Sequence, residues 1–129
     1  MTGFKFGTAI NCIDGRTQQV VIDYMRQNFE VDGVDMVNFP GADGTFANCE
    51  HSEELVFIKR ATSISIERHG SKVIAVVGHH DCAGNPGDKE HHYAHIRRAV
   101  QEVHSWKFPV QIIGLYVNDE WKIEEVRRS

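Results

Sequence analysis

Two short segments of the sequence carry side chains that could bind a metal ion. Residues 12–16 read CIDGR and include Cys12, and residues 78–82 read GHHDC and include His79 and Cys82. Zinc binds thiolate and imidazole ligands in a tetrahedral shell, and three protein ligands with an open fourth position are typical of a catalytic site. Each residue alone is explained equally well as a buried thiol or a hydrogen-bonded histidine. Together they predict a zinc centre.

A carboxylate and a guanidinium follow the first cysteine. Asp14 could take the fourth zinc position and close the site, or it could lie beside a zinc-bound water and accept a hydrogen bond from it. Arg16 favours the second arrangement, because a guanidinium paired with Asp14 would hold the carboxylate away from the metal. The alternative is an exposed ion pair in a loop, worth only about 0–1 kcal/mol. We predict Asp14 and Arg16 as catalytic residues because the pair adjoins a candidate ligand.

The two motifs follow two predicted strands. Residues 4–10 and 72–78 are rich in bulky and β-branched side chains, and each run ends close to one motif. In open α/β sheets, ligands bind beyond the carboxyl ends of the strands. Cys12 can therefore join His79 and Cys82 if these two strands are neighbours in the sheet.

Strands and helices alternate along the rest of the chain. The spacing of apolar residues predicts helices over 18–29, 52–69 and 89–106 and further strands over 34–39, 110–117 and 121–126. This order predicts a three-layer α/β fold with a mainly parallel sheet, in which helices flank four parallel strands and an antiparallel edge strand. A chain of 129 residues is expected to form a single domain over residues 1–129.

Composition narrows the functional classes. The net charge is −4 and Lys and Arg form no block longer than a pair, so we expect no nucleic acid as a partner. Apolar runs are far shorter than the roughly 18 residues of a spanning helix. We therefore expect no membrane association and, because no signal segment is evident, a cytoplasmic protein. Three cysteines without a CxxC motif favour metal ligation or a reactive thiol over disulfides, and Cys49 is interpreted as a partly buried free thiol.

Histidines also gather in the last predicted helix, at His91, His92 and His95. His91 and His95 are four residues apart, a spacing that can hold a metal on one helix face. No thiol or acidic partner is evident near them, so we interpret this cluster as a solvated helix face. Residues 40–44 are interpreted as a loop, because they are turn-forming and lack the lysine and spacing of a phosphate-binding loop.

The pattern C-x-D-x-R after a first strand, followed by G-H-x-x-C after a β-branched strand, resembles the β-class carbonic anhydrases. The order of elements is similar over nearly the whole chain, including the closing strand pair. The resemblance implies that Cys12, His79 and Cys82 bind Zn²⁺ and that Asp14 and Arg16 govern the fourth position.

The activity implied by this resemblance is that of a zinc lyase, a carbonate dehydratase. A zinc-bound hydroxide would hydrate carbon dioxide reversibly to bicarbonate. His80 is a candidate proton carrier, although an exposed histidine without this role is the simpler interpretation. The resemblance also implies a homodimer or a higher homo-oligomer with the site near a subunit boundary.

The sequence departs from the family pattern in three places. Compared with typical members, we expect the chain to be shorter and to have no counterpart of their N-terminal helical arm. Residues 39–43 read FPGAD where the family carries an Arg-Asn-Ala-Gly-Asn type segment, and Cys82 is followed by Ala83 instead of glycine. These departures leave the three candidate metal ligands in place. The substrate, the catalytic rate and the oligomeric state are left open.

Two alternatives remain at this point. Carbonyl sulfide and carbon disulfide are small linear heterocumulenes like carbon dioxide, and the same zinc site could hydrolyse them. The chain could instead be a non-catalytic zinc-binding or sensing module in which Asp14 is the fourth ligand, an interpretation that the intact Arg16 disfavours.

Overall fold

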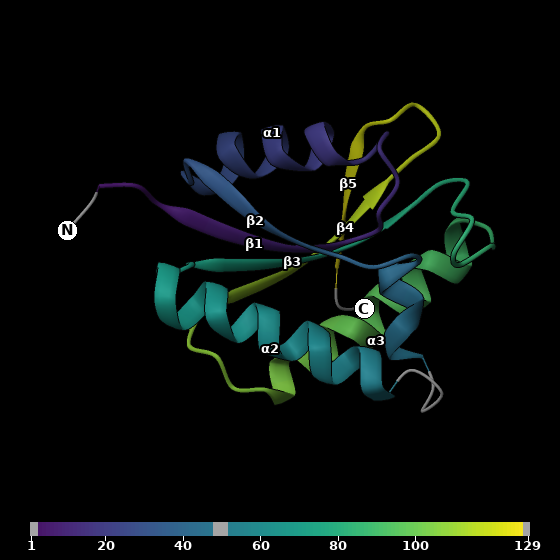
Figure 1. Cartoon of the computed structure of the whole chain (residues 1–129). Helices are drawn as coiled ribbons and strands as arrows, with labels where there is room; N and C mark the ends of the chain where they lie inside the picture. The colour runs from purple at the N-terminus through teal and green to yellow at the C-terminus, as the bar shows by residue number, and fades with distance from the viewer. Residues whose placement is uncertain (1–2, 48–51, 128–129) are drawn as a thin grey trace.

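The computed structural model describes residues 3–47 and 52–127 (Figure 1). The α/β class is confirmed, and each predicted helix and strand is present with ends that differ by no more than one or two residues. Whether the chain folds as a single domain stays a prediction. The elements in chain order are β1 (Phe6–Asn11), α1 (Gln18–Phe29), β2 (Gly33–Asn38), the 3-10 turn η1 (Ala42–Phe46), α2 (Ser52–His69), β3 (Val73–His79), α3 (Lys89–Ser105), β4 (Gln111–Val117) and β5 (Ile123–Val126).

One five-stranded sheet has the order β2-β1-β3-β4-β5. The first four strands are parallel, and β5 pairs with β4 in the antiparallel direction, as predicted. The chain adds β2 on one side of β1 and β3 on the other, so strand order reverses between β1 and β3. In sheets of this kind the gap beyond the carboxyl ends at such a reversal is where ligands bind.

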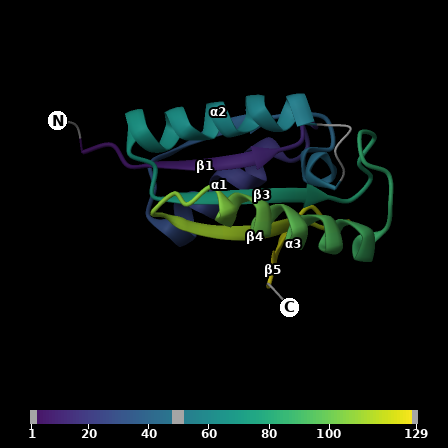
Figure 2. The same ribbon diagram turned by 90° about the horizontal axis from the view of Figure 1, so that it is seen from below.

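Strand β3 is the centre of the core. Its sequence VIAVVGH is buried at every position, which fits a parallel strand covered on both faces. Alternate residues point to opposite faces. Ile74 and Val76 pack in one hydrophobic cluster with α2 and α3, and Ala75 and Val77 pack in the other with α1. Figure 1 shows α1 on one side of the sheet and α2 and α3 on the opposite side. In Figure 2 the two helices α2 and α3 lie apart, with β1 and β3 visible between them.

The ends of the helices follow local chemistry. Asp88 caps α3, where its side chain accepts a hydrogen bond from the backbone N–H of His91. Glu30 takes the left-handed conformation at the C-cap of α1, with a φ of 55°, and Gly33 begins β2. Residues 40–44, interpreted as a loop, include the first part of η1, which begins at Ala42.

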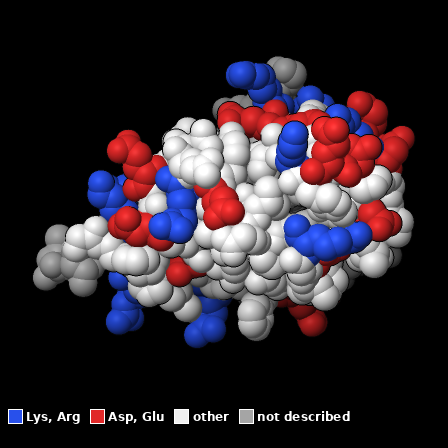
Figure 3. All heavy atoms as spheres, turned by 90° about the horizontal axis from the view of Figure 1, so that it is seen from above, with Lys and Arg blue, Asp and Glu red and all other residues white. Residues whose placement is uncertain are grey.

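Two further features of the structure concern membrane-spanning helices and surface charge. Within the described part of the chain, no helix combines the length and apolar character needed to cross a bilayer. On the face drawn in Figure 3, Lys and Arg side chains are separated from one another by acidic and uncharged ones.

A carboxylate on the edge strand joins β5 to α3 and to the β4–β5 turn. Glu124 accepts hydrogen bonds from Lys89 Nζ at 2.9 Å, Tyr93 Oη at 2.7 Å and Asn118 Nδ2 at 3.0 Å. These bonds, led by the one from Lys89, lower the pKa of Glu124 from 4.5 to about 2. The carboxylate therefore stabilises the folded chain in its ionised form.

Replacing Glu124 with Gln is expected to lower the free energy of unfolding at neutral pH by about 1 kcal/mol, after allowance for partial exposure. Because the folded pKa lies below the ordinary value, the stabilisation is complete above pH 4.5 and is lost as the pH falls toward about 2. Urea unfolding should show the difference between native chain and variant shrinking from neutral pH to about pH 3. A constant difference would contradict this role.

Candidate metal centre

The carboxyl ends of β1 and β3 bring the three predicted ligands together. Parallel pairing of β1 with β3 is present, with Ile10 opposite Val76, so the predicted neighbour relation is confirmed. Cys12, His79 and Cys82 are all buried, and their ligand atoms lie within 4.8 Å of one another. The two Sγ atoms are 3.9 Å apart. Among the described residues this is the one group of three or more His, Cys, Asp or Glu side chains with such geometry.

Hydrogen bonds to the backbone fix the position of Cys12. The side-chain oxygen of Asn11 accepts from the backbone N–H of Cys12 at 2.9 Å. The carbonyl oxygen of Cys12 accepts from Gln18 Nε2 at 2.8 Å and from Asn38 Nδ2 at 2.9 Å. Gln18 begins α1 and Asn38 ends β2, so these two elements hold Cys12 in place just beyond the end of β1.

His79 is oriented as a ligand would be. It is the last residue of β3 and is fully buried. Its Nδ1 lies 2.7 Å from the carbonyl oxygen of His80, to which it donates, and its Nε2 is buried with no hydrogen-bond partner among the described residues. A carbonyl acceptor on one ring nitrogen fixes the tautomer that leaves the other free for a metal. Asp81, with a φ of 57°, makes the tight turn that returns the chain to Cys82.

The donor set fits zinc. Tetrahedral zinc with Zn–S bonds of about 2.3 Å places two sulfurs about 3.8 Å apart, close to the 3.9 Å between Cys12 and Cys82. The pKa of Cys12 lies well below its usual range, first because of the hydrogen bond with Cys82 and also because His79 and the backbone N–H groups of Gly41 and Asp14 favour the thiolate, while burial opposes it. Deprotonation is therefore favoured at Cys12, whereas the pKa of Cys82 is raised, first by its hydrogen bond with Cys12 and then by burial.

Asp14 and Arg16 form the predicted pair. Arg16 Nε lies 3.0 Å from Asp14 Oδ1 and its terminal nitrogen 2.7 Å from Oδ2. These side-chain hydrogen bonds are the main cause that lowers the pKa of Asp14 to about 2. Asp14 Oδ2 is 3.9 Å from His79 Nε2, so the carboxylate lies beside the candidate ligands.

Two contacts of Arg16 were not predicted. Its guanidinium donates to the Asp81 carboxylate at 3.3 Å and lies 4.5 Å from the centroid of the Trp121 ring. Arg16 thus joins the loop after β1 to the turn after β3 and to the β4–β5 turn. The position of Asp81 inside the GHHDC motif could have suggested the first contact, whereas no local pattern indicates Trp121.

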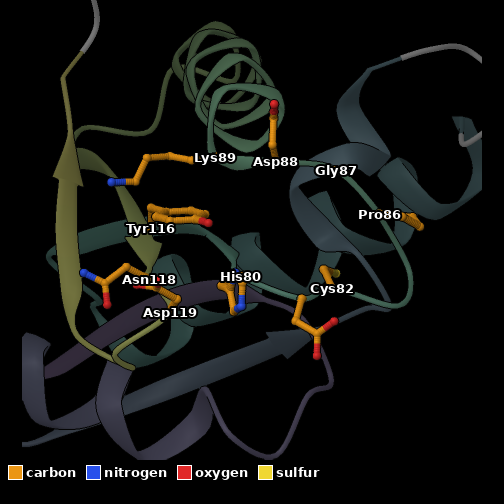
Figure 4. Close-up of a pocket in the computed structure, with 10 residues that line it drawn as sticks. His80, Cys82, Pro86, Gly87, Asp88, Lys89, Tyr116, Asn118 and Asp119 are labelled. Carbon is orange, nitrogen blue, oxygen red and sulfur yellow. The ribbon is translucent and has the colours of Figure 1, made fainter.

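A cavity of about 460 Å³ adjoins the candidate ligands at Cys82. Figure 4 shows Cys82 and His80 on one side of it, and Tyr116, Lys89 and Asn118 on the other. Cys82 therefore connects the buried ligand set to a hollow that a small molecule could enter.

The interpretation of the α3 histidines as a solvated face is wrong. His92 is fully buried, and its Nδ1 lies 2.7 Å from the carboxylate of Asp43. His91 and His95 both contact Asn85, at 2.7 and 3.0 Å, and their rings lie 4.2 Å apart. These contacts join α3 to the loops around the cysteines. Cys49, interpreted as a free thiol, lies outside the described residues.

Comparisons with known proteins identify a family and a fold. Residues 2–127 match the model of a family described as "Putative carbonic anhydrase". No curated protein sequence matches the chain.

Solved structures of β-carbonic anhydrases share the fold. A tetrameric enzyme from Sordaria macrospora is similar with a TM-score of 0.65 at 10% identity, over 98% of this chain and 82% of that one. The β-carbonic anhydrase of Aspergillus fumigatus is similar with a TM-score of 0.54 at 13% sequence identity, and the match covers 98% of this chain and 76% of that one. The carbonic anhydrase of Glaciozyma antarctica is similar with a TM-score of 0.54 at 17% sequence identity, and the match covers 93% of this chain and 80% of that one.

Replacing Cys12 or Cys82 with Ser should weaken the binding of a divalent transition metal by about 100-fold or more, because each substitution removes a thiolate ligand. Cobalt(II) is a suitable probe, since its thiolate charge-transfer absorption reports sulfur ligation directly. Cys49→Ser removes a thiol outside the proposed set and should leave both affinity and spectrum unchanged. Equal spectra for the native chain and both ligand variants would show that the cysteines do not bind the metal.

Proposed function

The chain belongs to a carbonic anhydrase family with the β-class fold, and from this premise we propose that it is a zinc lyase that hydrates carbon dioxide reversibly to bicarbonate. The observation that carries the proposal is the convergence of Cys12, His79 and Cys82 beside the Asp14–Arg16 pair. Held by these three residues, zinc would supply a hydroxide nucleophile at neutral pH.

Asp14 would act as a hydrogen-bond acceptor for the attacking oxygen. Its two carboxylate oxygens are each held by Arg16, so the side chain has one orientation and stays ionised. An ionised carboxylate can only accept hydrogen bonds, and it would therefore orient a hydroxyl whose lone pair faces the substrate. Arg16 is needed to keep Asp14 in this place, because without its partner the carboxylate could turn toward the cation.

His80 is the candidate for carrying the released proton to solvent. Its side chain lines the cavity beside Cys82, and its ring lies edge-on to Trp121 with the centroids 6.2 Å apart. Histidine can accept and release protons near neutral pH. The cavity offers a path from the metal centre to water.

Two alternatives use the same residues. Carbonyl sulfide and carbon disulfide are neutral and linear like carbon dioxide, and the cavity is large enough for all three. In a zinc-sensing module, Asp14 would be a fourth ligand, but its two-point pairing with Arg16 opposes this.

We also propose that copies of the chain associate. β2 is an edge strand, and on the helix beside it Val56 and Phe57 expose 69% and 72% of their surface. A groove lined mostly by apolar residues, with Asn38, Glu53 and Glu54 among them, runs between β2 and α2. Unpaired edge strands and exposed apolar patches favour association, and the structural relative from Sordaria macrospora is described as tetrameric.

We also propose a cytoplasmic location, because a reducing compartment keeps two neighbouring thiols available to a metal even before the metal binds. Two cysteines 3.9 Å apart would form a disulfide in an oxidising compartment unless metal protected them. Cell fractionation tests this location, and recovery from an extracellular or periplasmic fraction would contradict it.

Zinc-loaded protein is expected to hydrate carbon dioxide above the buffer rate in a stopped-flow assay. Arg16→Ala should lower kcat/KM by about 100-fold while keeping the zinc, because Asp14 loses its orientation. Arg97→Ala is the matched control, since Arg97 packs over Tyr93 on α3 and should leave the rate unchanged.

Each alternative gives a different result in the same experiment. Hydrolysis of carbonyl sulfide or carbon disulfide without hydration of carbon dioxide would replace the proposed substrate. Full zinc occupancy without turnover of any of the three would favour the sensing module. An unaltered kcat/KM in Arg16→Ala would contradict the proposed role of the Asp14–Arg16 pair.

Phe57→Glu is expected to shift the native assembly toward monomers in analytical ultracentrifugation, because it places a charge in the apolar patch beside β2. Phe4→Glu is the control, since Phe4 exposes 51% of its surface outside this patch. A monomeric native chain at micromolar concentration would contradict the proposed association.

A further inference from the structure

A buried carboxylate lies behind the metal centre and is not one of its candidate ligands. Asp43, in η1, is 1% exposed. Its Oδ2 lies 2.7 Å from His92 Nδ1, and its Oδ1 accepts from Asn85 Nδ2 and from the backbone N–H of Gly44, both at 3.0 Å. A buried carboxylate with several donors is costly to disturb, because a partner left unpaired cannot reach water.

The groups bound by Asp43 belong to three different segments. Gly44 follows Asp43 in η1, Asn85 follows Cys82 by three residues, and His92 lies on α3. The carboxylate also lies directly against β3, since an added Cβ at Gly78 would collide with Asp43 Oδ2. Asp43 therefore links the loop after β2, the loop after β3 and the helix that follows.

Both linked loops donate hydrogen bonds to the cysteine sulfurs. The backbone N–H of Gly41 donates to Cys12 Sγ at 3.4 Å. The backbone N–H groups of Asn85 and Gly84 face Cys82 Sγ and favour its thiolate, although the hydrogen bond with Cys12 and burial raise the pKa of Cys82 overall. Donors of this kind stabilise thiolates and hold their lone pairs in one direction. The positions of the two loops thus contribute to how both sulfurs are oriented.

The loops also touch each other without intervening side chains. A Cβ placed at Gly84 would lie 2.6 Å from the backbone nitrogen of Gly41, and Gly41 has a φ of 61°. Only glycine at both positions permits this approach. Asn85 extends the link to α3, because its side chain also contacts His91 and His95.

We propose that Asp43 is a positioning residue of the metal centre, which holds the Gly41 and Asn85 loops together so that their N–H groups point at Cys12 and Cys82. The inference rests on the proposed zinc site and assigns a role to the FPGAD segment, where the sequence departs from the family pattern. His92 acts in this network through Nδ1, since its Nε2 has no partner among the described residues.

Asp43→Asn tests this role with little change in shape. An amide has one acceptor oxygen, so it cannot replace both carboxylate oxygens, and its NH₂ group would face His92 or Asn85 as a second donor. The affinity for zinc, measured by competition with a chromophoric chelator, is expected to fall about 10- to 100-fold, as for other groups that orient ligands. The cobalt(II) charge-transfer band should shift or weaken as well.

Two further variants separate positioning from general destabilisation. Asp35→Asn is the matched control, because Asp35 accepts hydrogen bonds from Ser65 and His69, each at 2.7 Å, and contacts neither cysteine loop. Its affinity for zinc should stay within about twofold of that of the native chain, a change much smaller than the loss expected when a group that orients a ligand is removed. Asn85→Ala removes the amide but keeps the N–H that donates to Cys82, and it should weaken zinc binding like Asp43→Asn. If Asp43→Asn does not fold, the zinc affinity and the cobalt(II) spectrum of Asn85→Ala test the positioning role instead.

The outcomes distinguish this inference from the proposed function. A native chain that binds no metal would overturn both. Native zinc binding with unchanged affinity and cobalt spectrum in folded Asp43→Asn, or in Asn85→Ala, would overturn the positioning role alone. An equal loss of affinity in Asp35→Asn would also overturn it, because the effect would then come from general loss of stability.

Discussion

The parallel pairing of β1 with β3 is the constraint on which the proposed site depends. Ile10 lies opposite Val76, so Cys12 and His79 leave the sheet at the same edge, at the point where strand order reverses. The pairing is stabilised by the burial of β3 on both faces. The strongest hydrophobic element of the sequence therefore also positions the chemistry, and damage to this core would separate the ligands before it altered any of them.

The carboxylates of Asp14 and Asp43, which lie around the site, each have defined partners. Arg16 holds Asp14 and also reaches Asp81, which connects the loop after β1 to the turn after β3. On the other face of the sheet, Asp43 connects the loops whose N–H groups face the sulfurs. A cation at the thiolates would thus be surrounded by groups already oriented, a condition that favours catalysis because little reorganisation is needed.

Much of this could be predicted from local patterns. The β-branched run of β3 and the apolar spacing of α1 and α3 indicated their elements directly, and thiol and imidazole groups at two strand ends indicated a metal set. Asp43 could not be recognised, because Pro-Gly-Ala-Asp-Gly has the composition of any turn and its partners Asn85 and His92 lie far along the chain. The histidines of α3 were misread for the same reason, since their burial depends on loops that pack over the helix.

X-ray absorption at the zinc edge of the metal-loaded protein tests the central claim most directly, because it counts the sulfur ligands. Binding by Cys12, His79 and Cys82 predicts two sulfurs at about 2.3 Å and nitrogen or oxygen ligands at about 2.0–2.1 Å. A shell of light atoms alone, as histidines and carboxylates elsewhere on the chain would give, would contradict it.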